Sequence, residues 1–562
     1  MGIKGIYGEI GAGERIALAK LATDKFVETG RPLRIAVDIS IWQFQVQCGK
    51  GGSNPALRTL YYRFLRLLSL SIQPLFVFDG AHKPPFKRDR RTRTTTYSLP
   101  NFLTKQLLQL FGFPFVVAPG EAEAECALLQ REGIVDAVLS EDVDTLMFGC
   151  ERSMRNWSSE SVRGDAATHV SVYDASKIAA GASGLDREGM VLVALMSGGD
   201  YIPAGVPGCG IKVACEAARA GFGKSLFSLS KTDAAGFRAW RGNLAHELHS
   251  NDSKYFRVKH KSLQLPETFP NQEVLGYYTH PVISSAERVE RLKNELHWDR
   301  EVDIPSLRVF VAEAFEWQYK SGAIKFIRGL APALLVWKLR TRGAAATVHE
   351  GVVSSKTGEE RVVRSLCGRR THFSNDGIPE VRIEHVPIDI VGLNLDTEEQ
   401  ENRPVDAFGV EACPPLEHEV VEDDGVPTTL TTNGKRSIYD PTKPQRVWIG
   451  EPYVRVGVPL MFRDWEESLR NKSRSKSESA SAKTARKGQK KQRAVNGGMK
   501  AGALDPFVKV MKPGMGLDRA GAVSGVAQPP PLLSEPLSPT SSKAKGRVPE
   551  KTRQPIQQIN HN

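Results

Sequence analysis

Apolar runs and amphipathic stretches alternate along the first 230 or so residues of the chain. Three short apolar runs are typical of buried strands, and acidic residues follow them closely: residues 33–37 before Asp38, 75–78 before Asp79, and 135–139 before Glu141 and Asp142. Residues 56–70 and 121–131 carry apolar side chains at helical spacing. This alternation predicts an α/β fold with a mostly parallel central sheet flanked by helices, in which ligands bind at the carboxyl ends of the strands.

The pattern changes twice in the second half of the chain. Helical periodicity continues from residue 231 to 344 and ends in the apolar stretch 326–339. Period-2 alternation then predicts strands of a small β-rich module at three places: Val381 and Ile383; Val386, Ile388 and Ile390; and residues 447–458. The acidic segment 396–424 is interpreted as a loop of this module. Residues 469–562 are rich in Ser, Lys, Arg and Pro and predict a disordered basic tail.

The composition favours a nucleic acid as the partner. The 562 residues carry a formal net charge of +12 and a pI near 9.2, which favour a polyanion. No apolar run reaches the roughly 20 residues of a membrane-spanning helix, and the first residues lack the apolar core of a signal peptide. Seven scattered cysteines without a CxxC pair argue against a zinc knuckle or a disulfide framework. We therefore expect an intracellular protein with no membrane partner.

Acidic residues recur at five places where predicted elements begin or end: Asp38, Asp79, Glu121 with Glu123, Asp142 with Asp144, and Asp200. Each place taken alone is better explained by a turn or a helix cap. Carboxylates are, however, the ligands that Mg²⁺ prefers, and a two-metal site for phosphodiester cleavage needs several of them from separate elements. The combination therefore predicts a metal-dependent nuclease.

The same motifs resemble those of the flap endonuclease/XPG superfamily of structure-specific 5′ nucleases. Six motifs occur in the family's order: MGIKG at 1–5, VDIS at 37–40, FDG at 78–80, EAEAE at 121–125, EDVD at 141–144 and GDY at 199–201. The resemblance covers about residues 1–230 and implies a PIN-like 5′ nuclease core. It also implies that the seven carboxylates are catalytic and hold two Mg²⁺ ions, for which Mn²⁺ can substitute.

The choice between Glu123 and Glu125 depends on where the helix begins. In a regular helix Glu125 and not Glu123 shares a face with Glu121. The family pattern takes Glu121 and Glu123, which requires Glu121 to lie at a non-helical cap. We follow the family and keep Glu125 as the alternative.

A glycine-rich turn, residues 205–212, follows Asp200. Taken alone it is better explained as an ordinary loop than as a turn that brings backbone N–H groups to a phosphate. The resemblance implies the family's helix–two-turn–helix, a DNA-binding motif, and three residues match its pattern: Gly208, Gly210 and Lys212. A K⁺ ion is implied here as well, although Ala204 stands near the position where the family often has a serine.

A basic stretch lies between Asp79 and Glu121 and, without context, is equally well a solvated loop. The resemblance adds three of its residues to the catalytic set as groups that position the scissile phosphate: Lys87, Arg91 and Arg93. It implies DNA contacts at three further positions: Gly2, Lys83 and Arg88. Trp42 occupies the place of a family aromatic that stacks on a base, with a core tryptophan as the equal alternative.

The length of this stretch favours one branch of the family. Glu121 follows Asp79 by only 121 − 79 = 42 positions. A predicted helix (101–110) and strand (113–117) leave too little chain for the full helical arch of replicative flap endonucleases. The β-rich module is similar to the chromodomain that the Holliday junction resolvases of the Gen/Yen class use as an extra DNA contact. Three aromatic residues could line a cage there, although core packing is the simpler interpretation: Trp448, Tyr453 and Trp465.

We therefore expect five parts: an N-terminal nuclease region (1–105), an internal nuclease region with the helix–two-turn–helix (106–230), a helical end of the nuclease core (231–344), a chromodomain-like module (345–468) and the basic tail (469–562). The resemblance implies a Holliday junction resolvase of fungal style. It would be a monomer in solution and a homodimer on four-way junctions, where it makes paired symmetric nicks, and it would also cut 5′ flaps and forks. The basic run 485–493 predicts a nuclear location.

Two other functions stay open. One is a repair endonuclease that cuts flaps or gaps and handles four-way junctions poorly. The other is a non-catalytic scaffold that binds chromatin or DNA, against which the retention of all seven acids argues.

Overall fold

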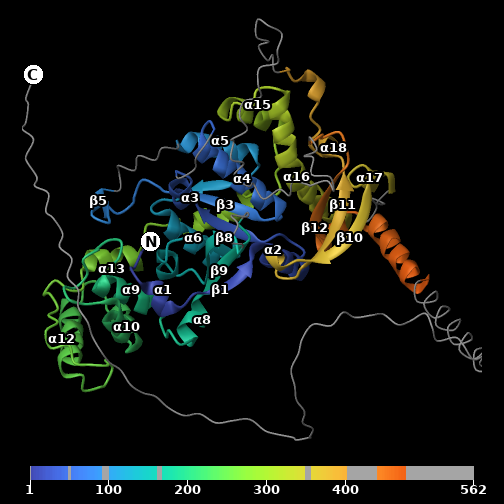
Figure 1. Ribbon diagram of the computed structural model, residues 1–562. Coiled ribbons are helices and arrows are strands. Elements are labelled where there is room, and N and C mark those ends of the chain that lie inside the picture. Colours follow the sequence, from blue (N-terminus) through green and yellow to red (C-terminus); the bar gives the residue numbers. More distant parts are fainter. Residues whose placement is uncertain are drawn as a thin grey trace, which may run out of the picture. The chain divides into compact units, whose positions relative to one another are not determined.

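The nuclease part is built on a seven-stranded mixed sheet. The computed structural model describes residues 2–47, 52–91, 100–160, 167–348, 356–400 and 439–475. The strands, in their spatial order, are β1 (Glu14–Ala17), β9 (His169–Asp174), β8 (Arg152–Ser158), β7 (Ala137–Leu139), β2 (Arg34–Asp38), β3 (Gln73–Phe78) and β6 (Phe115–Val117). The pairs from β8 to β6 are parallel, and only the two pairs that include β9 are antiparallel. The predicted α/β fold with a mostly parallel sheet is confirmed (Figure 1).

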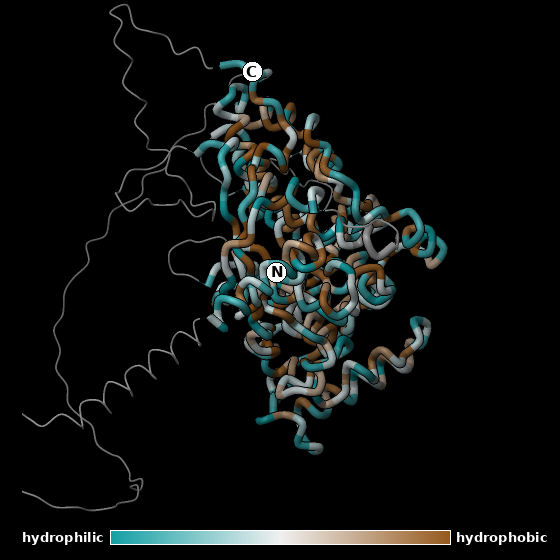
Figure 2. Tube along the Cα trace, turned by 90° about the vertical axis from the view of Figure 1, so that its right-hand side faces the viewer, coloured by the Kyte–Doolittle hydropathy of each residue, from teal (hydrophilic) through white to brown (hydrophobic). Residues whose placement is uncertain are grey.

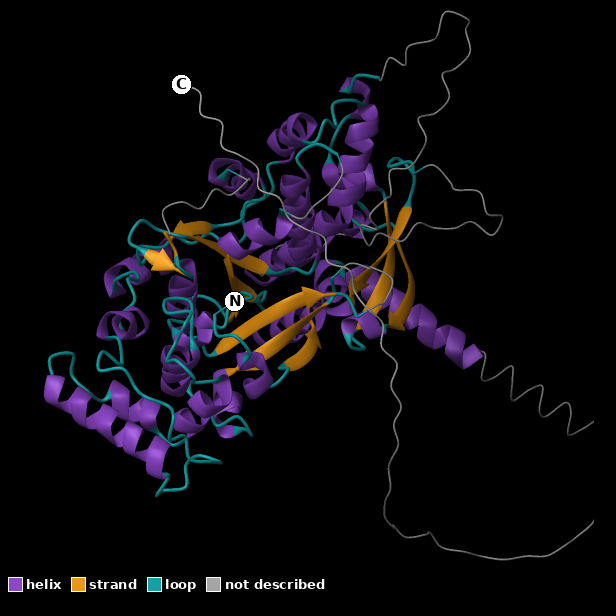
Figure 3. Ribbon diagram, turned by 60° about the vertical axis from the view of Figure 1, so that its left-hand side comes forward, coloured by secondary structure: helices purple, strands orange, loops and turns teal. Residues whose placement is uncertain are grey.

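Alternate residues of the central strands belong to two hydrophobic cores, one on each face of the sheet. Ile35 and Val37 of β2 lie in the first core, and Ala36 lies in the second. The first core is covered by α2 (Leu18–Thr29), α3 (Ile39–Val46), α4 (Pro55–Ser69), α5 (Asn101–Leu110), α15 (Ile304–Ala314) and α16 (Lys320–Val348). Helices therefore lie on both sides of the strands (Figure 3).

The second core joins the sheet to most of the remaining helices. They are α1 (Ile6–Ile10), α6 (Ala122–Arg131), α7 (Asp144–Met147), α8 (Ala175–Ala180), α9 (Arg187–Ser197), α10 (Ile211–Arg219), α11 (Phe222–Phe227), α12 (Ala234–Ser250), α13 (Gln272–Thr279) and α14 (Ala286–Glu295). Hydrophobic segments run through the interior and hydrophilic ones gather at the outer turns (Figure 2). Among the described helices, none combines the length and the hydropathy that crossing a membrane requires.

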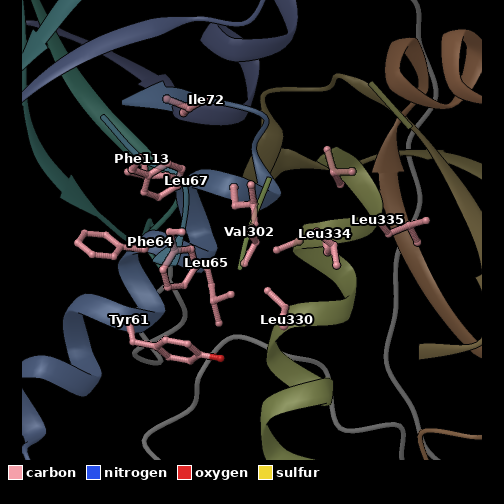
Figure 4. Close-up of a cluster of buried hydrophobic side chains, with 14 of the residues drawn as sticks. Tyr61, Phe64, Leu65, Leu67, Ile72, Phe113, Val302, Leu330, Leu334 and Leu335 are labelled. Carbon is pink, nitrogen blue, oxygen red and sulfur yellow. The ribbon is translucent and has the colours of Figure 1, made fainter. Parts of the chain in front are cut away.

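A second, three-stranded antiparallel sheet forms the β-rich module. Its strands are β10 (Ser365–Thr371), β11 (Pro379–His385) and β12 (Gln445–Gly450), with β11 in the middle. Val381, Ile383 and Ile449 on one face of this sheet belong to the same core as α4 and α16. In that core Leu65 of α4 lies on the side of Leu330 and Leu334 of α16, and Phe64 lies next to Phe113 (Figure 4). The nuclease and the module therefore share one hydrophobic core.

One strand prediction in the module was wrong, and a second was right only for residues 447–450, which belong to β12; proline explains the helix in both places. Residues 387–391 form α18 (Pro387–Val391), and residues 451–457 form α19 (Glu451–Gly457). Pro387 and Pro452 lie in the first turn of these helices, where proline forfeits no helical hydrogen bond, whereas in a central strand it removes one. A short helix, α17 (Lys356–Glu360), precedes β10.

A helix runs past the predicted start of the basic tail. Residues 459–475 are helical, so the helix extends beyond the expected boundary at residue 468. The rest of the tail, with the basic run 485–493, lies outside the described residues, as does the part of the predicted loop from residue 401 to 424.

Candidate active site

The structure places the seven predicted carboxylates at the ends of secondary-structure elements. Asp38 ends β2 and caps α3, Asp79 follows β3, Glu121 caps α6 with Glu123 in its first turn, Asp142 and Asp144 follow β7, and Asp200 follows α9. Because β7, β2 and β3 are neighbouring parallel strands, their carboxyl ends deliver these acids to one edge of the sheet. Six of the seven side chains are buried, and that of Asp79 is half-buried.

One group of carboxylates is compact enough to share a cation. Oxygen atoms of Asp142, Asp144 and Asp200 all lie within 4.8 Å of one another. Both carboxylate oxygens of Asp144 are buried and have no hydrogen-bond partner among the described residues. A buried charge without a partner is costly, and hard divalent cations bind such oxygen atoms. The donor set therefore fits Mg²⁺ or Mn²⁺.

A second group lies around Asp79. Its carboxylate accepts hydrogen bonds from Ser40 Oγ (3.2 Å) and from the backbone N of Ala122 (3.0 Å), so it is tied to the ends of β2 and α6. The Lys87 ammonium links the two groups, because Nζ lies 3.2 Å from Glu121 Oε1 and 3.5 Å from Asp200 Oδ2 and also contacts Glu123. The structure thus brings all the predicted acids into one site.

Burial and mutual repulsion raise the pKa of several of these acids. Burial raises the pKa of Asp38 well above its ordinary value, and Glu123 and Asp79 add to the effect. Burial, followed by Asp142 and Asp200, likewise raises the pKa of Asp144. The pKa of Glu123 rises to about 7, chiefly through burial, with Lys87 opposing the shift. So much concentrated negative charge is typical of a site that holds cations.

A small basic hairpin covers the site. Its strands are β4 (Phe86–Lys87) and β5 (Arg90–Arg91), and the turn residues Arg88 and Asp89 have φ of 55° and 58°. This left-handed pair is typical of a tight hairpin turn. Arg88 donates from Nε to Asp200 Oδ1 (2.8 Å) and from Nη2 to Asp200 Oδ2 (2.6 Å), and Nη2 also reaches Asp142 (3.2 Å). Lys83 contacts Asp79 at 3.1 Å.

Arg88 competes with a divalent ion for the same oxygen atoms. Replacing Arg88 with Gln is therefore expected to increase the affinity of the DNA-free protein for Mn²⁺ by about tenfold, since one charge-assisted bidentate contact is removed. This affinity is measured by titrating the protein with Mn²⁺ and detecting the free ion by electron paramagnetic resonance. Lys20→Gln, which removes a surface ion pair with Asp24, is the control. Unchanged Mn²⁺ affinity in the Arg88 variant would contradict the competition.

The pKa of Glu123 makes the stability of the metal-free protein depend on pH. A carboxyl whose folded pKa (about 7) exceeds its ordinary value of 4.5 binds more protons when folded over that interval. Its contribution to the free energy of unfolding therefore falls as pH rises from 4.5 to about 7. Urea unfolding in EDTA should show this fall in wild type, and the Glu123→Gln variant should show a smaller one. Equal pH profiles for the two proteins would refute the assignment.

Glu123 and Glu125 have different surroundings in the structure. The cap residue Glu121 has an extended backbone, with φ −81° and ψ 139°, which lets Glu121 and Glu123 face the same side. Glu125 is buried elsewhere and accepts a hydrogen bond from the backbone N of Ser284 (2.9 Å). The choice of Glu123 agrees with this geometry.

Four of the aromatic residues singled out in the sequence pack against neighbouring side chains. Trp42 is 4% exposed and packs against Phe64, Phe76 and Trp157, which favours the core interpretation over base stacking. The three aromatic residues of the module have different neighbours: Tyr453 packs on Phe26, Trp465 on Phe462, and Trp448 under Arg370. They therefore do not form one cage.

The remaining predicted residues lie close to the site or next to α9. The backbone N of Gly2 donates to Asp200 Oδ1 at 3.2 Å. Gly208 has φ +80°, Gly210 caps α10, and Lys212 is exposed in the first turn of α10, so the glycine-rich turn connects α9 to α10. The structure describes the backbone of Arg91 only, and Arg93 lies outside the described residues.

Two residues of the site were not predicted. The Tyr201 hydroxyl donates to Glu121 Oε2, and Ser40 donates to Asp79. Both belong to motifs recognised in the sequence, GDY and VDIS, so the motif was the available signal. Each hydroxyl follows an acid of its own motif but contacts an acid of another motif. The sequence does not reveal that second contact, so the roles of these hydroxyls could not be assigned from it.

This fold and this cluster of carboxylates define a nuclease of the XPG type, and comparison with known proteins agrees. The XPG N-terminal domain matches residues 1–98, the XPG I-region matches residues 112–200, and the Holliday junction resolvase Gen1 C-terminal domain matches residues 362–468. The chain belongs to the Gen branch of the flap endonuclease/XPG superfamily.

Solved structures and a curated relative support this membership. A structure of the eukaryotic junction-resolving enzyme GEN-1 binding with cesium is 49% identical, with a TM-score of 0.70, over 84% of this chain and 100% of that one. The Holliday junction-resolving enzyme GEN1 in complex with product DNA and Mg²⁺ is 48% identical, with a TM-score of 0.68 and the same coverage. Flap endonuclease GEN homolog 1 of Mus musculus is 32% identical over 214 residues, which are 34% of this chain and 23% of the relative. The chain thus spans about a quarter of the length of that relative.

Proposed function

We propose that this protein is a structure-specific endonuclease that resolves four-way DNA junctions by paired symmetric nicks and also cuts 5′ flaps and forks. The cluster around Asp144 carries the proposal, because the two buried carboxylate oxygens of Asp144 have no donor among the described residues and a divalent cation would match them. The similarity to a GEN1 structure with product DNA and Mg²⁺ supports it.

The carboxylates would hold two Mg²⁺ ions, with Mn²⁺ as a substitute. Asp142, Asp144 and Asp200 would bind one ion, and Asp38, Asp79, Glu121 and Glu123 would complete the set. Two such ions, when bound, supply an activated water and stabilise the leaving oxygen of a phosphodiester. A K⁺ ion at the turn between α9 and α10 belongs to the proposal, supported by a GEN-1 structure titled as binding with potassium.

The basic hairpin would bring the DNA to these carboxylates. Lys87 lies among Glu121, Glu123 and Asp200, so a phosphate that binds the carboxylate site through cations also meets the Lys87 ammonium. Arg91 and Arg93 are proposed to assist from the same segment. Gly208, Gly210 and Lys212 would hold the duplex backbone, which positions DNA without reading its sequence.

Two cuts in one junction need two copies of this single site. We propose that the protein is a monomer in solution and a homodimer on four-way junctions. The nucleus is the proposed location, in keeping with DNA-processing relatives such as the DNA excision repair protein ERCC-5 homolog of Xenopus laevis.

Cleavage of an intact four-way junction tests the proposal against its alternatives. A plasmid-borne cruciform treated with the full chain and Mg²⁺ is expected to give linear, ligatable product, which requires both nicks within the lifetime of one complex. The Asp38→Asn variant is the control. If the protein cuts 5′ flaps efficiently but leaves the cruciform uncut, the repair endonuclease is favoured. If wild type cleaves no substrate faster than the Asp38→Asn variant does, the scaffold is favoured.

A further inference from the structure

A deep cleft separates the nuclease core from the polar face of the C-terminal sheet. Its volume is about 1780 Å³, and we call it the intersheet cleft. Side chains of α3, α4 and the end of β8 form one wall, those of β10, β11 and β12 form the other, and α16 contributes between them. Leu139, Ser140 and Glu141 also line it, and Asp142 of the carboxylate cluster is the next residue. The lining of the intersheet cleft therefore extends to the residue that precedes Asp142 of the carboxylate cluster.

The charges that line the intersheet cleft are not balanced. Six arginines and four glutamates contribute, a difference of 6 − 4 = +2. Each glutamate already has an arginine partner: Glu141 with Arg155, Glu160 with Arg15, Glu380 with Arg370, and Glu384 with Arg446. The other four arginines have no carboxylate at salt-bridge distance within the described chain: Arg63, Arg66, Arg328 and Arg382.

Several hydrogen-bonding groups of the lining have no partner in the described chain, among them His385, the Tyr453 hydroxyl and three N–H donors. Arg66 Nε, Arg382 Nε and Trp157 Nε1 are buried and have no acceptor among the described residues. Burial lowers the pKa of Arg66, and Glu380 on the opposite wall opposes that shift. Unpaired buried donors and unbalanced cations are both stabilised by an anionic group that accepts hydrogen bonds. A phosphate is such a group.

Flat aromatic rings lie between these arginines. Trp42 and Trp157 stack with centroids 5.9 Å apart, and Arg63 lies 5.1 Å from the Trp42 ring. On the opposite wall Arg382 lies 5.7 Å from the Trp448 ring. Aromatic rings among cations are typical of surfaces that bind the bases and phosphates of single strands. Arg66 and Arg382 lie on opposite walls of the cleft, so a strand between them meets cations from both sides.

We propose that the intersheet cleft binds a short single-stranded segment of the DNA substrate, with phosphates on Arg66 and Arg382 and bases against Trp157 and Trp448. The proposal rests on the proposed function for its choice of ligand. It adds a subsite for the unpaired nucleotides that a 5′ flap offers. The module then acts on the strand that leaves the active site.

Binding of an oligothymidine of about 12 nucleotides, a length within the range of known single-strand sites, tests the proposal. The full chain is titrated in EDTA, where no strand is cut, and fluorescence anisotropy gives the Kd. The double variant Arg66→Met/Arg382→Met is expected to weaken binding about tenfold, and Trp157→Leu about fivefold. Arg361→Met, an exposed arginine of the module outside the cleft, is the matched control. Thermal melting verifies that each variant is folded.

Three results would overturn the proposal. The double variant could bind the oligothymidine as tightly as wild type. The affinity for a duplex of the same length could fall by the same factor, which would make the cleft a duplex contact. Polyglutamate could bind wild type and lose affinity in the double variant while the oligothymidine does not bind, which would assign the cleft to an acidic polypeptide. Because no cleavage is measured, these outcomes are independent of the junction test.

Discussion

The Asp144→Asn variant should lose nearly all cleavage and yet melt at a higher temperature than wild type when no divalent metal is present. Asp144 is fully buried, its oxygen atoms have no partner in the described chain, and its charge repels Asp142 and Asp200. Removing that charge relieves the repulsion and removes a cation ligand. Cleavage is expected to fall by about 10²–10³-fold, the range for loss of one group that stabilises transition-state charge.

Two measurements separate these effects. Single-turnover cleavage of a 5′ flap in Mg²⁺ gives the loss of activity, and melting in EDTA gives the gain in stability. Asp136→Asn is the control, because Asp136 is ion-paired with Arg31 and lies at the opposite, amino-terminal end of β7. That variant should melt lower than wild type. If Asp144→Asn also melted lower in EDTA, the repulsion inferred at the site would be wrong.

The Gly2→Ala variant should lose almost as much cleavage activity as the Asp144→Asn variant. Gly2 has φ +77°, and a Cβ there would contact an oxygen of Asp144 and come within 2.5 Å of Val143 Cγ1 and 2.8 Å of Asp142 Oδ1. Gly2→Ala must therefore displace the loop after β7, which carries two of the cation ligands. A displacement of about 1 Å in a reacting group costs about 10²-fold in rate, and we expect a loss of at least that size.

The position of the glycine makes this prediction specific. Gly8 in α1 has no neighbouring atom within 4 Å of its Cβ position, so Gly8→Ala should cleave at the wild-type rate. Cleavage should fall in the Gly2 variant, and the melting temperature in EDTA should fall only slightly, because the strain is confined to the end of the chain. Equal cleavage rates for the two variants would show that the N-terminal segment does not support the carboxylates.

The acids could be located from sequence because their positions follow from element ends. Asp38 and Asp79 come directly after apolar runs that form neighbouring parallel strands, so their approach follows from the fold class alone. Glu121 needed one more fact, the extended backbone of a cap residue, which family resemblance supplied and local spacing did not. The contacts of Lys87 and Arg88 with particular carboxylates depend on how the hairpin folds back, which no local pattern encodes.

Sequence-based predictions failed where the same spacing of apolar residues is compatible with two structures. Val386, Ile388 and Ile390 alternate like a strand, but Pro387 and Gly392 favour a single helical turn. Trp42 could stack on a base or fill the core, and its neighbours Phe64 and Phe76 come from other elements that its own sequence context does not reveal. β8 and β9 were not predicted, because their residues mix polar and apolar types at the edge side of the sheet.

The helices α4 and α16 share one core with the C-terminal sheet. A truncation that deletes the module therefore cannot separate a loss of DNA contacts from a loss of folding. Removing the module would leave the apolar flank of α16 in water, including the side of Leu335 and Leu339 that Val454 and Val458 now help to bury. A shortened protein would then tend to aggregate, and its inactivity would say little about DNA contacts. Point substitutions on the polar face of β10–β12, which leave that flank covered, are the way to separate a binding role from a scaffolding one.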